Sequence, residues 1–456
     1  MNTQYLLARS IGFNSPGEIK RATATRLVYA LQPSGATFSH RSPSPLTPNE
    51  APPAHISGVN ALAIDRFEGR YLLSGGSDSS LAIWDVESPV FTDGGSTSFR
   101  PLSALNKSAE EHKLGITQVA FYPFDSLAFL TSSYDHTVKI YSSETLKVSA
   151  SFDLDAVAYN IALSPVANHL LVACATQYPA VRLIDLRSGA NTHSLAGHSG
   201  AVLSTAWSPV REHILASGAT DGSVRFWDVR RSVGELGVLD LEDSTGIKVT
   251  SSSFTRNSTH GQAHRGPVNG IVWTEDGRHL VTCGHDDRIR VWDTETYANT
   301  LANFGPMVRN SGLAPCIPVL PPRQFLAPGN DGIFYPNGHE ILEYELFEGK
   351  LVRRLRRPER HHPVHQAKKG KDKEPVKDKI TALAWRADNI ELYSAHADGS
   401  ITAWKPRTEE DAEIDEEEKE EREDAEGSKK RKRNALEEIY QDLTKRKITF
   451  GGIQQS

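Results

Sequence analysis

The sequence predicts an all-β fold in which seven similar sheets form a closed ring, a seven-bladed β-propeller. Of its 456 residues, 38% are apolar, which is enough for a large core. The main observation is a recurring motif in which an aspartate stands six residues before an aromatic residue. Five copies have both residues: Asp78 and Trp84, Asp135 and Tyr141, Asp221 and Trp227, Asp286 and Trp292, and Asp398 and Trp404. Two weaker copies, near Asp185 and around Tyr344, bring the total to seven.

The spacing and the turn residues of these copies indicate one repeating unit. The shortest distance between corresponding positions is 43 residues, within the period of about 40–45 residues that is typical of WD repeats. In the fourth copy, residues 214–229, the apolar run ILASGA is followed by the turn TDGS and then by VRFWDV. Two β-prone runs around a tight polar turn predict a hairpin in each blade.

Two copies also contain the residue types of the hydrogen-bonded tetrad of WD repeats. They are His198, Ser217, Asp221 and Trp227 in the fourth copy, and His264, Thr282, Asp286 and Trp292 in the fifth. Buried histidine and aspartate side chains are tolerated where a hydrogen-bond network satisfies them. Because the same set recurs between blades, it indicates a structural network rather than a catalytic triad.

The sequence divides into three regions. We expect a helical extension over residues 1–24, a propeller over 25–405 and a charged, disordered tail over 406–456. The strand-like run 25–32 is expected to close the ring as the outermost strand of the last blade, which removes an exposed sheet edge. Four stretches are expected to be polar loop insertions: 33–53, 88–110, 232–262 and 353–379.

An arginine two residues after the motif aspartate is specific to the middle copies. Asp228 and Arg230 form the sequence WDVR, and Arg187 occupies the corresponding place in IDLR. Both positions follow the third strand of a blade, so both side chains are expected on one face. Arg230 then either pairs locally with Asp228, an exposed contact of little energetic value, or binds carbonyl or carboxylate oxygens of a partner.

The N-terminus leaves a similar choice. Leu6, Leu7 and Ile11 lie near one face of a short predicted helix, and Pro16 after Ser15 indicates the start of a second helix. The apolar residues either pack on the propeller or insert into a groove of a partner.

Several long stretches resemble the Cockayne syndrome group A family of WD-repeat proteins. Among them are LLARSIGF with EIKRATATRLVYAL at the N-terminus, and the fourth repeat with its WDVRRS end. The resemblance covers about residues 4–406 and fades in 33–53, in the sixth blade and in the tail. It implies a substrate receptor of a cullin-4 ubiquitin ligase in transcription-coupled nucleotide-excision repair.

The resemblance also implies roles for residues and partners. Leu6, Leu7, Ile11, Asp228 and Arg230 would contact the damage-binding adaptor of the ligase, with Arg187 as an auxiliary contact. Cullin-4 and the RING subunit would be indirect partners. The opposite side of the ring would meet the stalled RNA polymerase II machinery and the Cockayne syndrome B remodelling ATPase. The chain itself would catalyse nothing and would need no cofactor.

The tail has two opposed charge blocks. Residues 409–426 contain 13 acidic and 2 basic side chains. The basic run that follows resembles a nuclear import signal, so we expect a nuclear protein; it consists of Lys429, Lys430, Arg431, Lys432 and Arg433. Residues 434–447 have helical spacing of apolar side chains and form either a partner-binding helix or one that packs on the propeller.

Other functions receive less support from the sequence. The basic stretch 353–379 is interpreted as a solvated insertion, and direct nucleic-acid binding is not expected from the chain. Its histidines His361, His362 and His365 lack helical spacing and a nearby carboxylate or cysteine set, so no metal site is predicted. No membrane span, signal peptide or nucleotide-binding loop is recognised. The alternative function is a nuclear WD-repeat scaffold in chromatin or ribosome assembly without a ligase.

Overall fold

The computed structural model divides the chain into two units, Met1–Pro406 and Arg407–Ser456. It describes residues 7, 10–12, 15–39, 54–91, 97–105, 111–166, 169–231, 235–241, 261–357 and 379–407. Of the second unit, only Arg407 is described. The predicted import signal 429–433 and the helix-like stretch 434–447 therefore lie outside the described residues, as do His361, His362 and His365.

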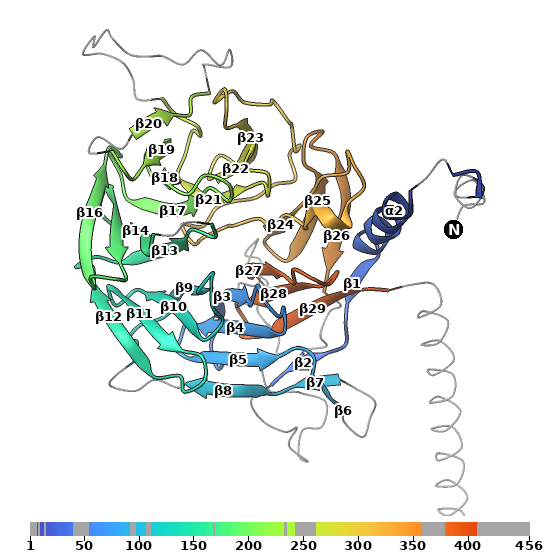
Figure 1. Cartoon of the computed structure of the whole chain (residues 1–456), viewed down its shortest axis with the longest axis horizontal. Coiled ribbons are helices and arrows are strands. Elements are labelled where there is room, and N and C mark those ends of the chain that lie inside the picture. The colour runs from blue at the N-terminus through green and yellow to red at the C-terminus, as the bar shows by residue number, and fades with distance from the viewer. Residues whose placement is uncertain are drawn as a thin grey trace, which may run out of the picture. The chain divides into compact units, whose positions relative to one another are not determined.

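The first unit is a seven-bladed β-propeller, which confirms the predicted fold class (Figure 1). First strands of neighbouring blades contact each other around the ring, as β3 does with β9 and β13 with β17. Every strand within a blade pairs antiparallel to its neighbour. Blades 1 to 3 comprise β3 (Val59–Ile64), β4 (Tyr71–Gly76), β5 (Leu81–Asp85) and β8 (Pro101–Leu105); β9 (Ile116–Phe121), β10 (Ala128–Ser133), β11 (Thr137–Ser142) and β12 (Val148–Asp153); β13 (Ala158–Leu163), β14 (Leu171–Thr176), β15 (Ala180–Asp185) and β16 (Ala190–Ala196).

The remaining blades have the same antiparallel arrangement, with an exception in blade 6. Blade 6 has no regular first strand; an isolated bridge between Val319 and Phe334 joins its inner segment to β24. Blades 4 to 7 comprise β17 (Val202–Trp207), β18 (Ile214–Ala219), β19 (Val224–Asp228) and β20 (Glu235–Val238); β21 (Val268–Trp273), β22 (His279–Gly284) and β23 (Arg288–Asp293); β24 (Gly332–Asn337), β25 (Glu340–Glu345) and β26 (Leu351–Arg356); β27 (Ile380–Trp385), β28 (Leu392–His396), β29 (Ile401–Pro406) and β1 (Leu31–Pro33).

The ring is closed by the N-terminal segment, as predicted, but the closing strand is shorter than the predicted run 25–32. β1 pairs with β29, with Leu31 opposite Pro406. The preceding helix α2 (Pro16–Val28) continues through the first four residues of that run. Its start is fixed by a capping box, in which the Ser15 hydroxyl accepts from the Glu18 amide and the Glu18 carboxylate accepts from the Ser15 amide.

Tertiary packing explains why the β-branched residues Thr25 and Val28 are helical rather than extended. Both are buried, and Val28 packs in a core cluster with residues of blades 6 and 7. The Thr25 hydroxyl accepts from the Ala327 amide at 2.7 Å, beside the short helix η1 (Arg323–Phe325). Such contacts override a local preference for strand. The helical extension therefore reaches Val28 instead of ending at residue 24.

All four stretches expected to be loops contain strand residues, since β26 extends to Arg356, inside the stretch 353–379. β8 and β20 are the outer strands of blades 1 and 4, although they fall within 88–110 and 232–262. β2 (Thr37–Phe38), β6 (Val90–Phe91) and β7 (Thr97–Phe99) form a small extra sheet. Phe38 and Phe99 stack with ring centroids 4.8 Å apart, and both are buried with Trp84. Buried aromatic residues within polar surroundings were the sequence signal for this sheet.

The hydrophobic cores lie between neighbouring blades. Leu73 and Ile83 of blade 1, for example, pack in one cluster with Ile116, Phe129 and Tyr141 of blade 2. The motif tryptophans are buried in these clusters, including Trp84, Trp227, Trp292 and Trp404. The repeat therefore places one large aromatic residue in the third strand of most blades, which sets the spacing around the ring.

Candidate functional site

The antiparallel blades give the ring two distinct faces. The links after the first and the third strand of a blade leave from the same edge; in blade 4 the Val229 amide donates to the His213 carbonyl at 3.1 Å. We call the side with these links, which include residues 208–213 and 229–231, the Arg230 face. The opposite side has the links between second and third strands, including 220–223, and we call it the His198 face.

On the Arg230 face, Arg230 and Asp228 form a two-point ion pair. Nε of Arg230 donates to Oδ1 of Asp228 at 3.1 Å, and Nη2 donates to Oδ2 at 3.0 Å. The Asp228 side chain is buried, whereas 63% of the Arg230 side chain is exposed. Hydrogen bonding from Arg230 lowers the pKa of Asp228. The aspartate fixes the plane of the guanidinium group and leaves its outer edge open to a partner.

The corresponding aspartates of other blades have different partners. Asp185 of blade 3 accepts from the backbone amide of Arg187 at 2.9 Å, and the Arg187 side chain is exposed on the same face. In blade 1, Arg70 from the link after the first strand donates to both oxygens of Asp85. This ion pair lowers the pKa of Asp85 to about 2. A fixed arginine after the third strand with its own aspartate is thus a property of blade 4.

Exposed apolar side chains surround these arginines. They recur in the links after the first strands of blades 1 to 4, with exposed fractions between 37% and 58%; they are Phe67, Phe124, Leu127, Val166 and Val210. The same kind of link places all of them on the Arg230 face. An apolar arc beside a few charged groups is typical of protein–protein interfaces.

The N-terminal residues fall into two groups. Leu7 and Ile11 are 63% and 60% exposed, and the Ile11 amide donates to the Leu7 carbonyl at 3.1 Å, a helical bond. Leu6 lies outside the described residues. α2, in contrast, is fixed to blade 6, where Arg353 donates to the carbonyls of Val28 and Leu31. The predicted alternatives therefore divide along the chain: α2 packs on the propeller, and Leu7 and Ile11 do not.

The tetrad residues predicted in blade 4 lie together in one buried network. Nε2 of His198 is 2.7 Å from the Ser217 hydroxyl, which also accepts from the indole nitrogen of Trp227 at 2.7 Å. Nδ1 of His198 is 3.6 Å from Asp221. Burial alone would raise the pKa of Asp221, but hydrogen bonds from His198, Ser223 and Ser199 outweigh it and lower that pKa.

Blade 5 repeats this arrangement. His264 lies 2.7 Å from the Thr282 hydroxyl and 2.9 Å from Asp286, and Trp292 donates to Thr282 at 2.9 Å. Burial lowers the pKa of His264, which favours the neutral ring. These histidines and aspartates connect strands inside the blades, and their polar side-chain atoms form hydrogen bonds within the tetrads.

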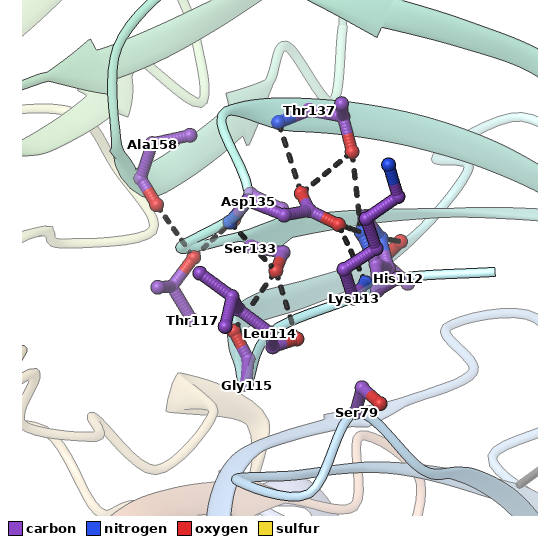
Figure 2. A network of polar contacts seen from close by, with 12 residues as sticks. Ser79, His112, Lys113, Leu114, Gly115, Thr117, Ser133, Asp135, Thr137 and Ala158 are labelled. Atoms are coloured by element: carbon purple, nitrogen blue, oxygen red, sulfur yellow. Dashed lines mark hydrogen bonds and ion pairs between the residues drawn. The ribbon is translucent and has the colours of Figure 1, made fainter. Parts of the chain in front are cut away.

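Blades 1 and 2 contain equivalent networks that were not predicted from the sequence. Nε2 of His55 is 2.7 Å from Ser74, and Nε2 of His112 is 2.6 Å from Thr131. Figure 2 shows Asp135 of blade 2 between His112 and Thr137 and hydrogen-bonded to both. The signal was present, because each histidine precedes its hydroxyl residue by 19 positions, the same interval as between His198 and Ser217.

Two other kinds of site find no support in the part of the chain that the structure describes. No group of three or more histidine, cysteine or acidic side chains is placed to hold a metal ion there. Among the same residues, no helix has the length and apolar character needed to cross a membrane.

Comparison with known proteins agrees with the fold. The family described as WD domain, G-beta repeat, matches residues 48–85, 104–142, 189–228 and 254–293. The fold and the matched repeats are those of a WD40-repeat propeller.

The names of individual relatives indicate more than one function. The chain is 29% identical to the WD repeat-containing protein ATCSA-1 of Arabidopsis thaliana over 80% of its own length and 89% of the relative. It is 28% identical to Radiation-sensitive protein 28 of Saccharomyces cerevisiae, over 41% of this chain and 39% of the relative. Ribosome biogenesis protein ytm1 of Neurospora crassa is 27% identical over 58% of this chain and 59% of the relative.

Proposed function

We propose that this chain is the substrate-recognition subunit of a cullin-4 RING ubiquitin ligase that acts in transcription-coupled nucleotide-excision repair. The observation that carries the proposal is the combination on the Arg230 face of a guanidinium group fixed by Asp228 with an exposed apolar arc. The relation to ATCSA-1, which extends over most of both chains, supports the same function.

The N-terminal segment and the Arg230 face would together bind the damage-binding adaptor of the ligase. Leu7 and Ile11 would insert their apolar side chains into an adaptor groove, which explains why they do not pack on the propeller. Arg230 would donate its outer N–H groups to adaptor carbonyl or carboxylate oxygens, with Arg187 beside it. α2 would hold the segment at a fixed place because it is bonded to blade 6.

In this assembly the chain is a receptor and not an enzyme. Ubiquitin transfer would belong to the cullin-4 and RING subunits, which the adaptor connects to this protein. The His198 face would meet the repair machinery at a stalled RNA polymerase II, including a remodelling ATPase of the Cockayne syndrome B type. The basic run 429–433 would direct the protein to the nucleus. A reporter fused to residues 406–456 that stays in the cytoplasm would contradict the nuclear assignment.

The alternative is a nuclear scaffold in ribosome assembly without a ligase. A specific observation favours keeping it, namely the match to ytm1 proteins over roughly half of the chain. That match spans less of both proteins than the match to ATCSA-1 does. A scaffold of this kind also gives no reason for two exposed apolar residues at the N-terminus together with the fixed Arg230.

The deciding experiment is affinity purification of the full chain from nuclear extract. The test variant combines Leu7→Asp, Ile11→Asp and Arg230→Ala. Arg265→Ala serves as a control because the Arg265 side chain is exposed on the opposite, His198 face. We expect the intact chain and the control to recover the adaptor and cullin-4, and the triple variant to lose both. A deletion should stop before Ser15, since removing residues 1–24 would destroy the capped helix that packs on blade 6.

Either of two results would contradict the receptor function. If the triple variant recovers the adaptor as well as the intact chain does, the contact residues are wrong. If the folded intact chain recovers ribosome assembly factors and no adaptor, the scaffold alternative replaces the proposal.

A further inference from the structure

A polar cavity on the His198 face is not used by the function proposed above. It lies between blades 4 and 5 and has a volume of about 1160 Å³. Its wall includes Arg265, Arg288 and Arg290 of blade 5, together with Asp221 of blade 4 and Asp286 of blade 5. Three arginines in one cavity of this size raise the question of which anion they would hold.

A departure of blade 5 from the repeat pattern creates part of this wall. In four other blades a hydroxyl residue stands two positions after the motif aspartate and donates to it; these pairs are Asp78 and Ser80, Asp135 and Thr137, Asp221 and Ser223, and Asp398 and Ser400. In blade 5 this position is Arg288, whose side chain is exposed. Arg290 donates to Asp286 at 2.7 Å instead.

Asp240 also lines the cavity, and the other two aspartates accept from donors of the tetrads. Asp221 accepts from the Ser223 hydroxyl at 2.6 Å and from the Ser199 amide at 2.8 Å, one on each oxygen. Asp286 accepts from His264 on one oxygen and from Arg290 on the other. Both carboxylates are thus held by donors of the tetrads, and neither forms an ion pair with Arg265 or Arg288.

Arg265 and Arg288 remain available. Both side chains are exposed, and neither forms an ion pair with any residue that the structure describes. Arg265 uses its backbone amide for Asp286, at 3.3 Å, so its guanidinium group is not needed for the tetrad. Two free guanidinium groups at the same cavity can together bind a carboxylate or a phosphate group.

We propose that the cavity bordered by Arg265 and Arg288 binds an acidic segment of a partner protein. Its carboxylate or phosphate oxygens would accept from the two guanidinium groups, and its backbone would lie along the polar wall between blades 4 and 5. A nucleic-acid backbone fits less well, because it requires a continuous basic track, and Asp221 and Asp286 interrupt any such track here. The role of this cavity as the substrate side of the receptor rests on the proposed function. The binding of an acidic segment to the cavity does not depend on that function.

The test uses the full-length chain and fluorescent degenerate peptides of equal length. One pool has two central glutamates, one has a central phosphoserine and one has two central glutamines. We expect the two anionic pools to bind and the glutamine pool not to bind. The Arg265→Gln, Arg288→Gln double variant should lose about tenfold or more in affinity, since each charge-assisted hydrogen bond contributes substantially. Comparing the two anionic pools identifies the source of the anion.

Control measurements separate this outcome from unfolding and from failure of the proposed function. Arg66→Gln removes an equally exposed charge from blade 1 and should leave peptide affinity unchanged. Both variants should keep the thermal midpoint of the wild type, because the tetrad of blade 5 does not use the side chains of Arg265 or Arg288. The double variant should still recover the ligase adaptor. Peptide binding without adaptor recovery by the wild type would leave the cavity proposal intact and refute the receptor function.

Three results would overturn the proposal. The first is absence of binding by both anionic pools, and the second is equal binding by the wild type and the double variant. The third is displacement of bound peptide by single-stranded DNA at lower concentration than by unlabelled acidic peptide, which would assign the arginines to nucleic acid.

Discussion

Blades 4 and 7 reach the same polar architecture with different residues. In blade 4, His198 connects the Ser217 hydroxyl to Ser223, and through it to Asp221. In blade 7, Arg357 donates to the Ser400 hydroxyl at 2.6 Å and to Asp398 at 3.0 Å. The tryptophan has the same role in both blades: Trp227 donates to Ser217, and Trp404 donates to Ser394. In these two blades the aspartate and the tryptophan are therefore constant, whereas the third donor differs.

The largest effect is expected where the aspartate is removed. Asp221→Ala leaves His198, Ser223 and the Ser199 amide without their acceptor in a largely buried place. We expect the free energy of unfolding to fall by about 3 kcal/mol. Urea denaturation followed by tryptophan fluorescence measures the change, and Glu144→Ala, at an exposed turn, is the matched control. A loss equal to that of the control would mean that the tetrad does not stabilise blade 4.

A change in blade 7 tests whether Arg357 stabilises that blade as His198 stabilises blade 4. Arg357→Met removes the guanidinium donors to Asp398 and Ser400, whereas Asp398 keeps the Ser400 amide and hydroxyl; the Arg357 side chain is mostly buried. We expect a loss of about 2 kcal/mol in the free energy of unfolding. The neighbouring Arg356→Met serves as the control, because the Arg356 ion pair with Glu340 is exposed. Equal losses in the two variants would mean that Arg357 is not part of the network.

Acidification should destabilise blade 5 through the buried His264. Burial lowers the pKa of His264 in the folded state, so the unfolded chain binds the proton more tightly. Stability is then lost as the pH falls below the unfolded value of about 6.5, by at most about 1.4 kcal/mol per pH unit for one such group.

A second loss of stability is expected from the tetrad aspartates. The pKa of Asp221 and of Asp286 is lowered in the folded state, so their contribution is present above the unfolded pKa of about 3.9 and is lost as the pH falls below it. Urea titrations at a series of pH values measure both phases. His264→Gln should flatten the first phase and leave the second; if it leaves the first phase unchanged, other groups cause it.

The sequence was sufficient to predict the parts of the fold that repeat. The interval between aspartate and aromatic residue predicted seven blades, and the run that includes Leu31 was correctly expected to pair with the last blade. Structural features that occur only once in the chain were not predicted, because there is no second copy with which to compare them. The helical state of Thr25 depends on a bond to Ala327. Arg357, which directly follows β26 of blade 6, joins the tetrad of blade 7. Both depend on residues distant in sequence.

The candidate site was predictable in its residues but not in its geometry. Asp228 and Arg230 stand out in the sequence, yet the two alternatives for Arg230 turn out to be compatible. The local ion pair uses Nε and Nη2, and the rest of the exposed guanidinium group remains open. The apolar arc was not predicted, although Phe124, Val166 and Val210 each follow a proline after the first strand of a blade. Their exposure on one face becomes visible only in the structure.

The smallest effect on stability is expected for the residue with the largest expected effect on binding. Arg230→Ala removes an exposed side chain, and Asp228 retains the backbone amide of residue 230 as a donor. The urea midpoint should therefore stay at the wild-type value, while adaptor recovery should fall. Arg70→Ala is the informative counterpart, because it breaks the similar ion pair with Asp85 in blade 1, away from the arginines of blades 3 and 4. If Arg70→Ala and Arg230→Ala reduce adaptor recovery equally, general positive charge rather than the WDVR geometry of blade 4 holds the adaptor.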